Sequence, residues 1–221
     1  MLRLHHFPLC PFSRKVRVAL YEKEEQPELE AVEPWHQQRE LAALNPAAEV
    51  PVLEDSGRVI NDSWAICEYL DETRPEPGLL GKSLLERAEV RRLIAWFDVK
   101  FSREVTDLVW REKVIKRLKD SGTPNSAAVR AGLTNIHAHM EYIGYLYEQR
   151  NWLAGDSLSL ADIAAAAQLS VLDYLGDVPW EGHPAAKLWY ARIKSRPSFR
   201  PLLQDRLPGL KPAQQYDDLD F

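Results

Sequence analysis

The sequence has little cysteine, no excess of basic residues and no long apolar run. Its 221 residues include only two cysteines, Cys10 and Cys67. A disulfide framework is therefore excluded, and a reducing compartment is favoured. The formal net charge of −5 provides no basic surface for nucleic acid. The longest uncharged apolar run, residues 163–172, is too short to cross a bilayer. We therefore expect a cytoplasmic protein that neither binds nucleic acid nor inserts into a membrane.

Hydrophobic residues at 45% and charged residues at 28% are typical of globular proteins, and the chain is long enough for two small domains. The first third alternates the patterns of strands and helices. The expected strands are 2–7, 28–34, 50–55 and 57–62, and the expected helices begin at Pro11 and cover 38–44 and 62–73. The order βαβαββα predicts an α/β domain over residues 1–75.

Proline and glycine interrupt this pattern at "RPEPGLLGK", residues 74–82, which predicts an interdomain linker centred on 76–82. Strand patterns are absent beyond it. Amphipathic periodicity predicts a long helix or a bent pair of helices over 84–120, and single helices over 127–149 and 185–199, within an all-α domain that covers 83–207. Prolines and Gly209 predict that the remaining segment, 208–221, is an extended tail.

The segment "LSLADIAAAA", residues 158–167, carries the pattern of a helix N-terminus. Ser159 is a good N-cap, Asp162 is placed to accept from its N–H, and Leu158 and Ile163 have the spacing of a hydrophobic staple. The alanine-rich helix that follows allows its neighbours to approach closely. We expect this helix to lie at the centre of the helical domain.

Three motifs together resemble the cytosolic glutathione transferase superfamily over about residues 1–207: "LCPFSRKVRVAL" (9–20), "NPAAEVPVLED" (45–55) and "LSLADIAAAA". Each motif is weak alone, but their order around a proline-rich linker is specific. The resemblance implies a thioredoxin-like N-terminal domain, an all-helical C-terminal domain and a homodimer.

Cys10 is the candidate reactive residue. A cysteine at the start of a helix has a lowered pKa, because the helix terminus places N–H groups and partial positive charge near the sulfur; Arg14 would add to this if it pointed there. Ser13 either stabilises the thiolate or is an ordinary first-turn residue. The C-x-x-S pattern lacks a resolving thiol, so Cys10 could form a mixed disulfide with glutathione but could not exchange dithiols. Cys10 and Ser13 are catalytic candidates only if the protein is an enzyme.

The resemblance also assigns a glutathione site. It implies a cis Val50–Pro51 bond, with the Val50 backbone pairing with the cysteinyl part of glutathione. Asp62 and Ser63 match the pair that binds the γ-glutamyl group, although an ordinary N-cap explains them equally well. Glu49 departs from the family, since glutathione-binding members often carry Lys or Gln there. Like charges about 4 Å apart cost roughly 1 to 4 kcal/mol, so we expect weak glutathione binding or none.

The chain ends in "YDDLDF", residues 216–221, in which apolar side chains alternate with acids. This composition is typical of a linear docking motif, with a frayed, solvated tail as the alternative. Trp35 follows Pro34 on a loop, where it could be an interface anchor or surround a ligand. The candidate partner-binding residues are Trp35, Tyr216, Asp218, Leu219, Asp220 and Phe221.

Segments such as "EPW" (33–35), "LDYLGDVPW" (172–180) and "DLDF" (218–221) resemble one branch of the superfamily, whose members bind the tubulin-like division protein FtsZ. The resemblance implies a dimer that binds FtsZ filaments at the division site and requires no cofactor. The competing hypothesis is a glutathione-dependent transferase or thiol transferase that uses Cys10. Histidine pairs at 5–6 and 137–139 lack a third ligand nearby, so no metal site is expected. We favour the interaction protein.

Overall fold

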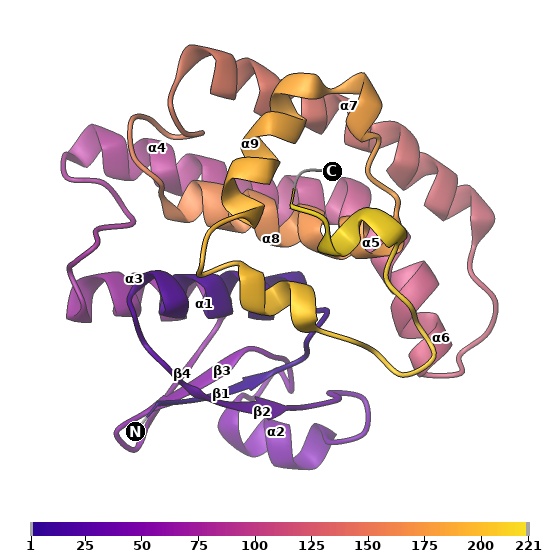
Figure 1. The fold of residues 1–221 in the computed structure, drawn as a ribbon. Coiled ribbons are helices and arrows are strands. Elements are labelled where there is room, and N and C mark those ends of the chain that lie inside the picture. The colour runs from indigo at the N-terminus through magenta and orange to yellow at the C-terminus, as the bar shows by residue number, and fades with distance from the viewer. Residues whose placement is uncertain (1, 220–221) are drawn as a thin grey trace.

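The structure is a computed structural model, and it describes residues 2–219 (Figure 1). The N-terminal domain contains a four-stranded sheet in the order β2-β1-β3-β4. Strand β1 pairs in parallel with β2 and antiparallel with β3, and β3 pairs antiparallel with β4. The strands are β1 (Leu2–His6), β2 (Glu28–Ala31), β3 (Val52–Asp55) and β4 (Arg58–Asn61). The predicted βαβαββα order and thioredoxin-like fold are confirmed.

Three helices flank this sheet: α1 (Pro11–Glu22), α2 (Gln38–Leu44) and α3 (Ser63–Thr73). Helices α1 and α3 lie between the sheet and the helical domain, and α2 covers the opposite face (Figure 1). The β3–β4 hairpin closes at Ser56 and Gly57, whose φ angles are 52° and 82°. Two central residues with positive φ match the right-handed twist of the paired strands.

The helical domain begins with one continuous helical segment over residues 84–118. It consists of α4 (Leu84–Ala95), η1 (Trp96–Thr106), α5 (Asp107–Trp110), η2 (Arg111–Ile115) and α6 (Lys116–Leu118), where η1 and η2 are π-helical. This agrees with the long helix, one of the two alternatives predicted for 84–120. The remaining helices are α7 (Ser126–Gln149), α8 (Leu160–Leu175), α9 (Pro184–Lys194) and the short 3₁₀ turns η3 (Trp180–Gly182), η4 (Arg200–Gln204) and η5 (Gln214–Asp217). No helix within residues 2–219 combines the length and apolar character needed to cross a bilayer.

Helix α8 lies at the centre of the molecule, buried over its whole length except Leu175. The predicted capping box at its start is confirmed, with Ala161 N donating to Ser159 Oγ and Ser159 N donating to Asp162. The buried Asp162 carboxylate also accepts from Leu153 N at 2.9 Å and from the Trp189 indole at 3.0 Å. Asp162 therefore joins α8 to both the preceding loop and α9.

Helix α1 packs along α8, and buried charges join the two domains there. The Arg14 and Arg17 guanidinium groups contact Asp205 at 3.2 Å and 2.8 Å. Glu22, near the end of α1, accepts from Arg196 at 2.6 Å. Since these charges are largely shielded from water, their pairing couples the domains tightly.

The tail differs from the extended segment that we predicted, because it folds back onto the helical domain (Figure 1). Ala213 N donates to Tyr174 O at 2.8 Å, and the Tyr174 hydroxyl donates to Leu210 O at 2.7 Å. The Tyr216 side chain is fully buried, and its hydroxyl donates to Leu202 O at 3.0 Å. The prediction that Tyr216 contacts a partner is therefore wrong, because this side chain anchors the tail in the core.

Candidate functional site

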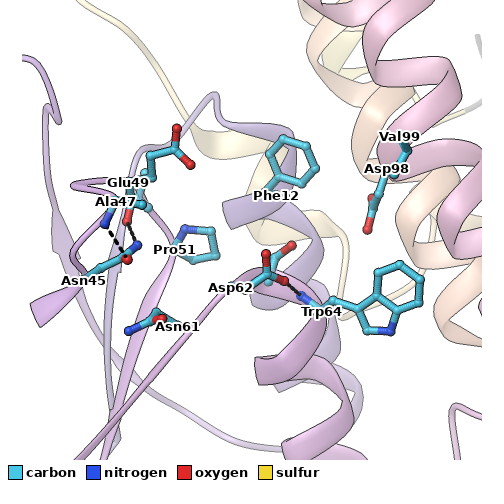
Figure 2. Close-up of a pocket in the computed structure, with 12 residues that line it drawn as sticks. Phe12, Asn45, Ala47, Glu49, Pro51, Asn61, Asp62, Trp64, Asp98 and Val99 are labelled. Atoms are coloured by element: carbon cyan, nitrogen blue, oxygen red, sulfur yellow. Dashed lines mark hydrogen bonds between the residues drawn. The ribbon is translucent and has the colours of Figure 1, made fainter.

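A cleft of about 450 Å³ lies between the N-terminal domain and η1 (Figure 2). We call it the acidic cleft. It is lined by Phe12, Asn45, Ala47, Glu49, Val50, Pro51, Asn61, Asp62, Ser63, Trp64, Asp98 and Val99. Four residues predicted for the glutathione site, Val50, Pro51, Asp62 and Ser63, are thus brought together as expected.

The charge of the acidic cleft is negative. Glu49, Asp62 and Asp98 contribute carboxylates, and no Lys, Arg or His is among the described lining residues. Lys15 forms a buried ion pair with Asp98, so its charge already has a partner. Figure 2 shows the Asp98 side chain extending from the helical domain toward Asp62 and Trp64. Because the charges of Lys15 and Asp98 offset each other, an anionic ligand would meet the carboxylates of Glu49 and Asp62 and no free cation among the described lining residues.

The loop before β3 holds Glu49 at the edge of this cleft. Asn45 Nδ2 donates to Glu49 O at 2.8 Å, and Asn45 Oδ1 accepts from Ala47 N at 3.1 Å (Figure 2). The Val50–Pro51 bond is cis, as expected. The motif over residues 45–55 does not by itself indicate a role for Asn45, whose side-chain contacts shape this loop.

Cys10 is the N-cap of α1 and is 7% exposed, and its Sγ lies 4.0 Å from Val50 O. Burial raises the pKa of the Cys10 thiol, although hydrogen bonds from Ser13 and the Phe12 backbone act in the opposite direction. The negative charge of Glu49 adds a smaller increase. The predicted lowering of this pKa is therefore wrong, because desolvation of the thiolate outweighs the helix N-terminus.

Arg14 does not assist Cys10. Its guanidinium donates to Pro8 O at 2.8 Å and to Ser170 Oγ at 3.0 Å, within the interdomain contact. Ser13 is buried, and its hydroxyl accepts from Phe7 N at 3.3 Å. Ser13 therefore supports the chain around Cys10, as well as opposing the rise in its pKa.

Asp62 and Ser63 fit both interpretations that the sequence left open. Asp62 caps α3, with Oδ1 accepting from Trp64 N at 2.7 Å. Its φ of 68° is uncommon for residues other than glycine, although aspartate adopts positive φ more readily than most. Both residues also line the acidic cleft, so the N-cap role is satisfied and a ligand role is still possible geometrically.

A second hollow, of about 190 Å³, lies on the other side of Phe12 and Val50, and we call it the aromatic groove. Cys10 lines this groove, together with Phe7, Phe12, Trp35 and Trp110. The Trp35 ring packs edge-on against Phe7, with 5.2 Å between ring centroids. Trp35 is thus half-buried at the mouth of a hollow. This position is compatible with an interface anchor and with a residue that surrounds a ligand, the two interpretations that the sequence left open.

The candidate partner-binding residues of the tail that the structure describes do not line the aromatic groove. Asp218 is exposed and lines a third hollow with Val178, Trp180 and Lys187. Leu219 is half-buried against the core, and Asp220 and Phe221 lie outside the described residues. Trp35 and the tail therefore line separate hollows.

The histidine contacts in the structure differ from the pairs of histidines that are neighbours in the sequence, at 5–6 and 137–139. His137 Nδ1 lies 2.9 Å from His183 Nε2, while His139 is buried between Trp96 and Glu104. Within residues 2–219, no group of three or more His, Cys, Asp or Glu side chains is arranged to hold a metal ion.

The family follows from comparison with known proteins. Residues 4–78 match the family model "Glutathione S-transferase, N-terminal domain", and residues 113–197 match "Glutathione S-transferase, C-terminal domain". The chain belongs to the glutathione S-transferase family.

Comparison with individual relatives places the chain more narrowly within the family. The chain is 52% identical to FtsZ-localized protein A of Caulobacter vibrioides, over 99% of this chain and 97% of the relative. Among solved structures, it is similar to a glutathione S-transferase from Rhodospirillum rubrum F11, with 55% identity, a TM-score of 0.98 and full coverage of both chains. It is also similar to FzlA from C. crescentus, with 51% identity and a TM-score of 0.96, over 100% of this chain and 99% of that one.

Proposed function

We propose that this protein binds FtsZ filaments during bacterial cell division and does not depend on glutathione. The observation that carries the proposal is the 52% identity, over 99% of the chain, to a protein named for its localisation with FtsZ. Binding to FtsZ would place the protein at the division site.

The charge of the acidic cleft supports the second half of the proposal. Glutathione carries two carboxylates and one ammonium group, so it has a net negative charge at neutral pH. The described lining of the cleft offers the carboxylates of Glu49 and Asp62 and no free base, while Asp98 is already paired with Lys15. Like charges a few ångströms apart repel each other even in water. We therefore expect the acidic cleft to bind glutathione weakly or not at all.

We assign two regions to the partner, Trp35 and the chain's acidic end, which line separate hollows. Trp35 is a half-buried aromatic side chain at the mouth of a groove, a setting typical of interface anchors. Asp218 is exposed and Leu219 is half-buried, and Asp220 and Phe221 complete the apolar and acidic alternation in the sequence. Tyr216 contributes indirectly, by fixing where this end leaves the core.

A homodimer is part of the proposal. Leu84 and Leu85, at the start of α4, are 87% and 84% exposed. Adjacent large apolar side chains in solvent favour an interface, and a dimer would present two FtsZ-binding surfaces at once. Sedimentation velocity with wild type and a Leu84→Glu, Leu85→Glu variant tests this, since the variant should sediment as a monomer.

Co-sedimentation with GTP-polymerised FtsZ tests the main proposal. The protein should pellet with polymers in a saturable manner and stay in the supernatant when GDP replaces GTP. Failure to pellet with polymers would exclude filament binding.

The second candidate function is a transferase or thiol transferase that uses Cys10. In its favour, Cys10 caps a helix and lines a groove beside a cis-proline loop. Calorimetric titration with glutathione, and thiol-transfer assays of wild type and Cys10→Ser, separate the candidates. We expect no saturable binding and no Cys10-dependent turnover; tight binding with such turnover would establish the enzyme instead.

A further inference from the structure

The aromatic groove has unpaired hydrogen-bond donors in its walls. The indole nitrogens of Trp35 and Trp110 are shielded from solvent and have no acceptor among the described residues. The indoles of Trp64, Trp96, Trp180 and Trp189 all donate to side chains, at 3.0 to 3.2 Å. Burying a donor without an acceptor is unfavourable by about 1 to 3 kcal/mol. Two such donors therefore flank one small hollow.

The size of the groove limits what it can hold. Its volume of about 190 Å³ is sufficient for one large apolar side chain with part of its backbone. Phe7, Phe12 and Ile115 supply apolar walls, which favour an aliphatic or aromatic side chain.

The charges near the groove identify the kind of acceptor. Glu49 lies in its lining, and the Arg111 side chain already donates to Asp107 at 2.7 Å. A carboxylate would be repelled by Glu49 and would find no free cation among these lining residues. The charges of the lining therefore favour a neutral acceptor, such as a backbone carbonyl oxygen.

We propose that the aromatic groove takes one apolar side chain of FtsZ together with a flanking backbone carbonyl, which accepts from the Trp110 and Trp35 indoles. This inference rests on the proposed function. Since both nitrogens are shielded in the free protein, binding includes a turn of the indole rings toward the carbonyl. The hydrogen bonds that the free protein lacks then form only in the complex.

The variant Trp110→Phe tests this, because it keeps an aromatic ring and removes the indole N–H together with part of the ring system. Titration with FtsZ polymers should show binding weakened about fivefold, the effect of one hydrogen bond. The melting temperature of the free variant should fall by less than that of Trp96→Phe, because both variants lose the same ring atoms but only Trp96→Phe also loses a hydrogen bond.

Trp96→Phe is the matched control, since its indole donates to His139 at 3.1 Å and it lines neither hollow. Trp96→Phe should melt at a lower temperature than wild type, and it should bind FtsZ like wild type. The inference is overturned if Trp110→Phe binds like wild type. It is also overturned if Trp110→Phe loses stability as Trp96→Phe does, since the donor would then be paired in the free protein.

A measurement without FtsZ separates this inference from the proposed function. N-acetyl-leucinamide carries one apolar side chain and neutral carbonyls. In protein labelled with ¹⁵N-tryptophan, it should shift the indole N–H signals of Trp110 and Trp35, assigned with the Phe variants, and leave the Trp96 signal in place. Unmoved signals overturn the groove assignment even if FtsZ binds, whereas shifted signals without FtsZ co-sedimentation support the groove and overturn FtsZ as its source.

Discussion

At the scale of single residues, Cys10 and Glu49 decide what the acidic cleft and its surroundings can do. The helix N-terminus at Cys10 would lower the thiol pKa, but burial has the larger effect and raises it. Glu49 is exposed at the edge of the cleft, where it opposes both a thiolate and an anionic ligand. Both effects disfavour glutathione chemistry.

Replacing Glu49 should therefore improve glutathione binding. In Glu49→Gln, removal of one exposed negative charge should strengthen binding about fivefold, as expected for like charges separated by a few ångströms in water. Calorimetry measures this, with Glu40→Gln on α2 as an exposed control outside the cleft. Equal affinity of the two variants would mean that Glu49 does not weaken binding.

His6 should make the protein sensitive to acid. Burial, with smaller contributions from Arg17 and Arg14, lowers the pKa of His6 to about 3. Between the unfolded pKa near 6.5 and this value, only the unfolded chain takes up the proton. The free energy of unfolding should therefore fall by about 1.4 kcal/mol per pH unit as the pH drops through this window.

Urea unfolding of wild type and His6→Gln between pH 4.5 and 7.5 measures this effect. The slope of the free energy of unfolding against pH should be smaller for His6→Gln than for wild type, by the equivalent of about one proton. The surface variant His36→Gln should have the same slope as wild type. Parallel curves for His6→Gln and wild type would contradict the assignment.

The sequence predicted those site residues that lie in local motifs. Val50, Pro51, Asp62 and Ser63 were implied by the resemblance to the transferase superfamily, whose motifs here are local in sequence. Asp98 could not be found this way, since it comes from a helix in the other domain and reaches the cleft only through the tertiary fold. The raised pKa of Cys10 was missed for the same reason, because burial depends on distant segments.

At the scale of elements, helix caps show how local signals determine structure. The N-terminus of α8 was predicted within a residue because Ser159 and Asp162 satisfy each other and the first N–H groups. The fold of the tail was not predicted correctly, because its prolines and acids indicate an extended chain. The burial of Tyr216 depends instead on a site formed by α1, α8 and α9.

The two capping boxes found within residues 2–219 allow a matched test. Ser159 is buried, whereas Ser83 caps α4 in solvent with the same arrangement. Ser159→Ala should lower the free energy of unfolding by about 1 to 2 kcal/mol, and Ser83→Ala by about 0.5 kcal/mol, since water replaces an exposed cap. Chemical denaturation measures both, and a larger loss in Ser83→Ala would refute the comparison.

Two truncations separate the anchor of the tail from its end. The Tyr216 ring lies 5.9 Å from both the Arg14 guanidinium and the Lys194 ammonium and packs against Tyr174. A chain ending at Gln215 should lose about 3 to 5 kcal/mol of stability, as for other buried aromatic side chains. A chain ending at Asp217 should melt within a few degrees of wild type and pellet less with FtsZ. If the Asp217 truncation pellets like wild type, the last four residues do not contribute.

At the scale of the whole molecule, buried interdomain charges make the two domains one cooperative unit. Asp205 faces Arg14 and Arg17, which are almost fully buried. Asp205→Ala leaves two guanidinium groups without their acid, so stability should fall by about 3 to 5 kcal/mol. Glu28→Ala, which breaks an exposed pair with Arg3, should change it by less than about 1 kcal/mol.

Scanning calorimetry measures both variants and tests cooperativity directly. Wild type should show one unfolding transition, because neither domain keeps its buried charges paired alone. Two separated transitions in wild type would show that the domains unfold independently.

The Tyr216 anchor also has a practical consequence for imaging. A fluorescent protein fused behind the last residue would sit a few residues from a side chain locked in the core, directly over the short acidic end. Such a fusion would crowd the surface proposed for FtsZ. Strand β1 lies in the N-terminal domain (Figure 1), so a reporter attached before it would leave the acidic end uncovered.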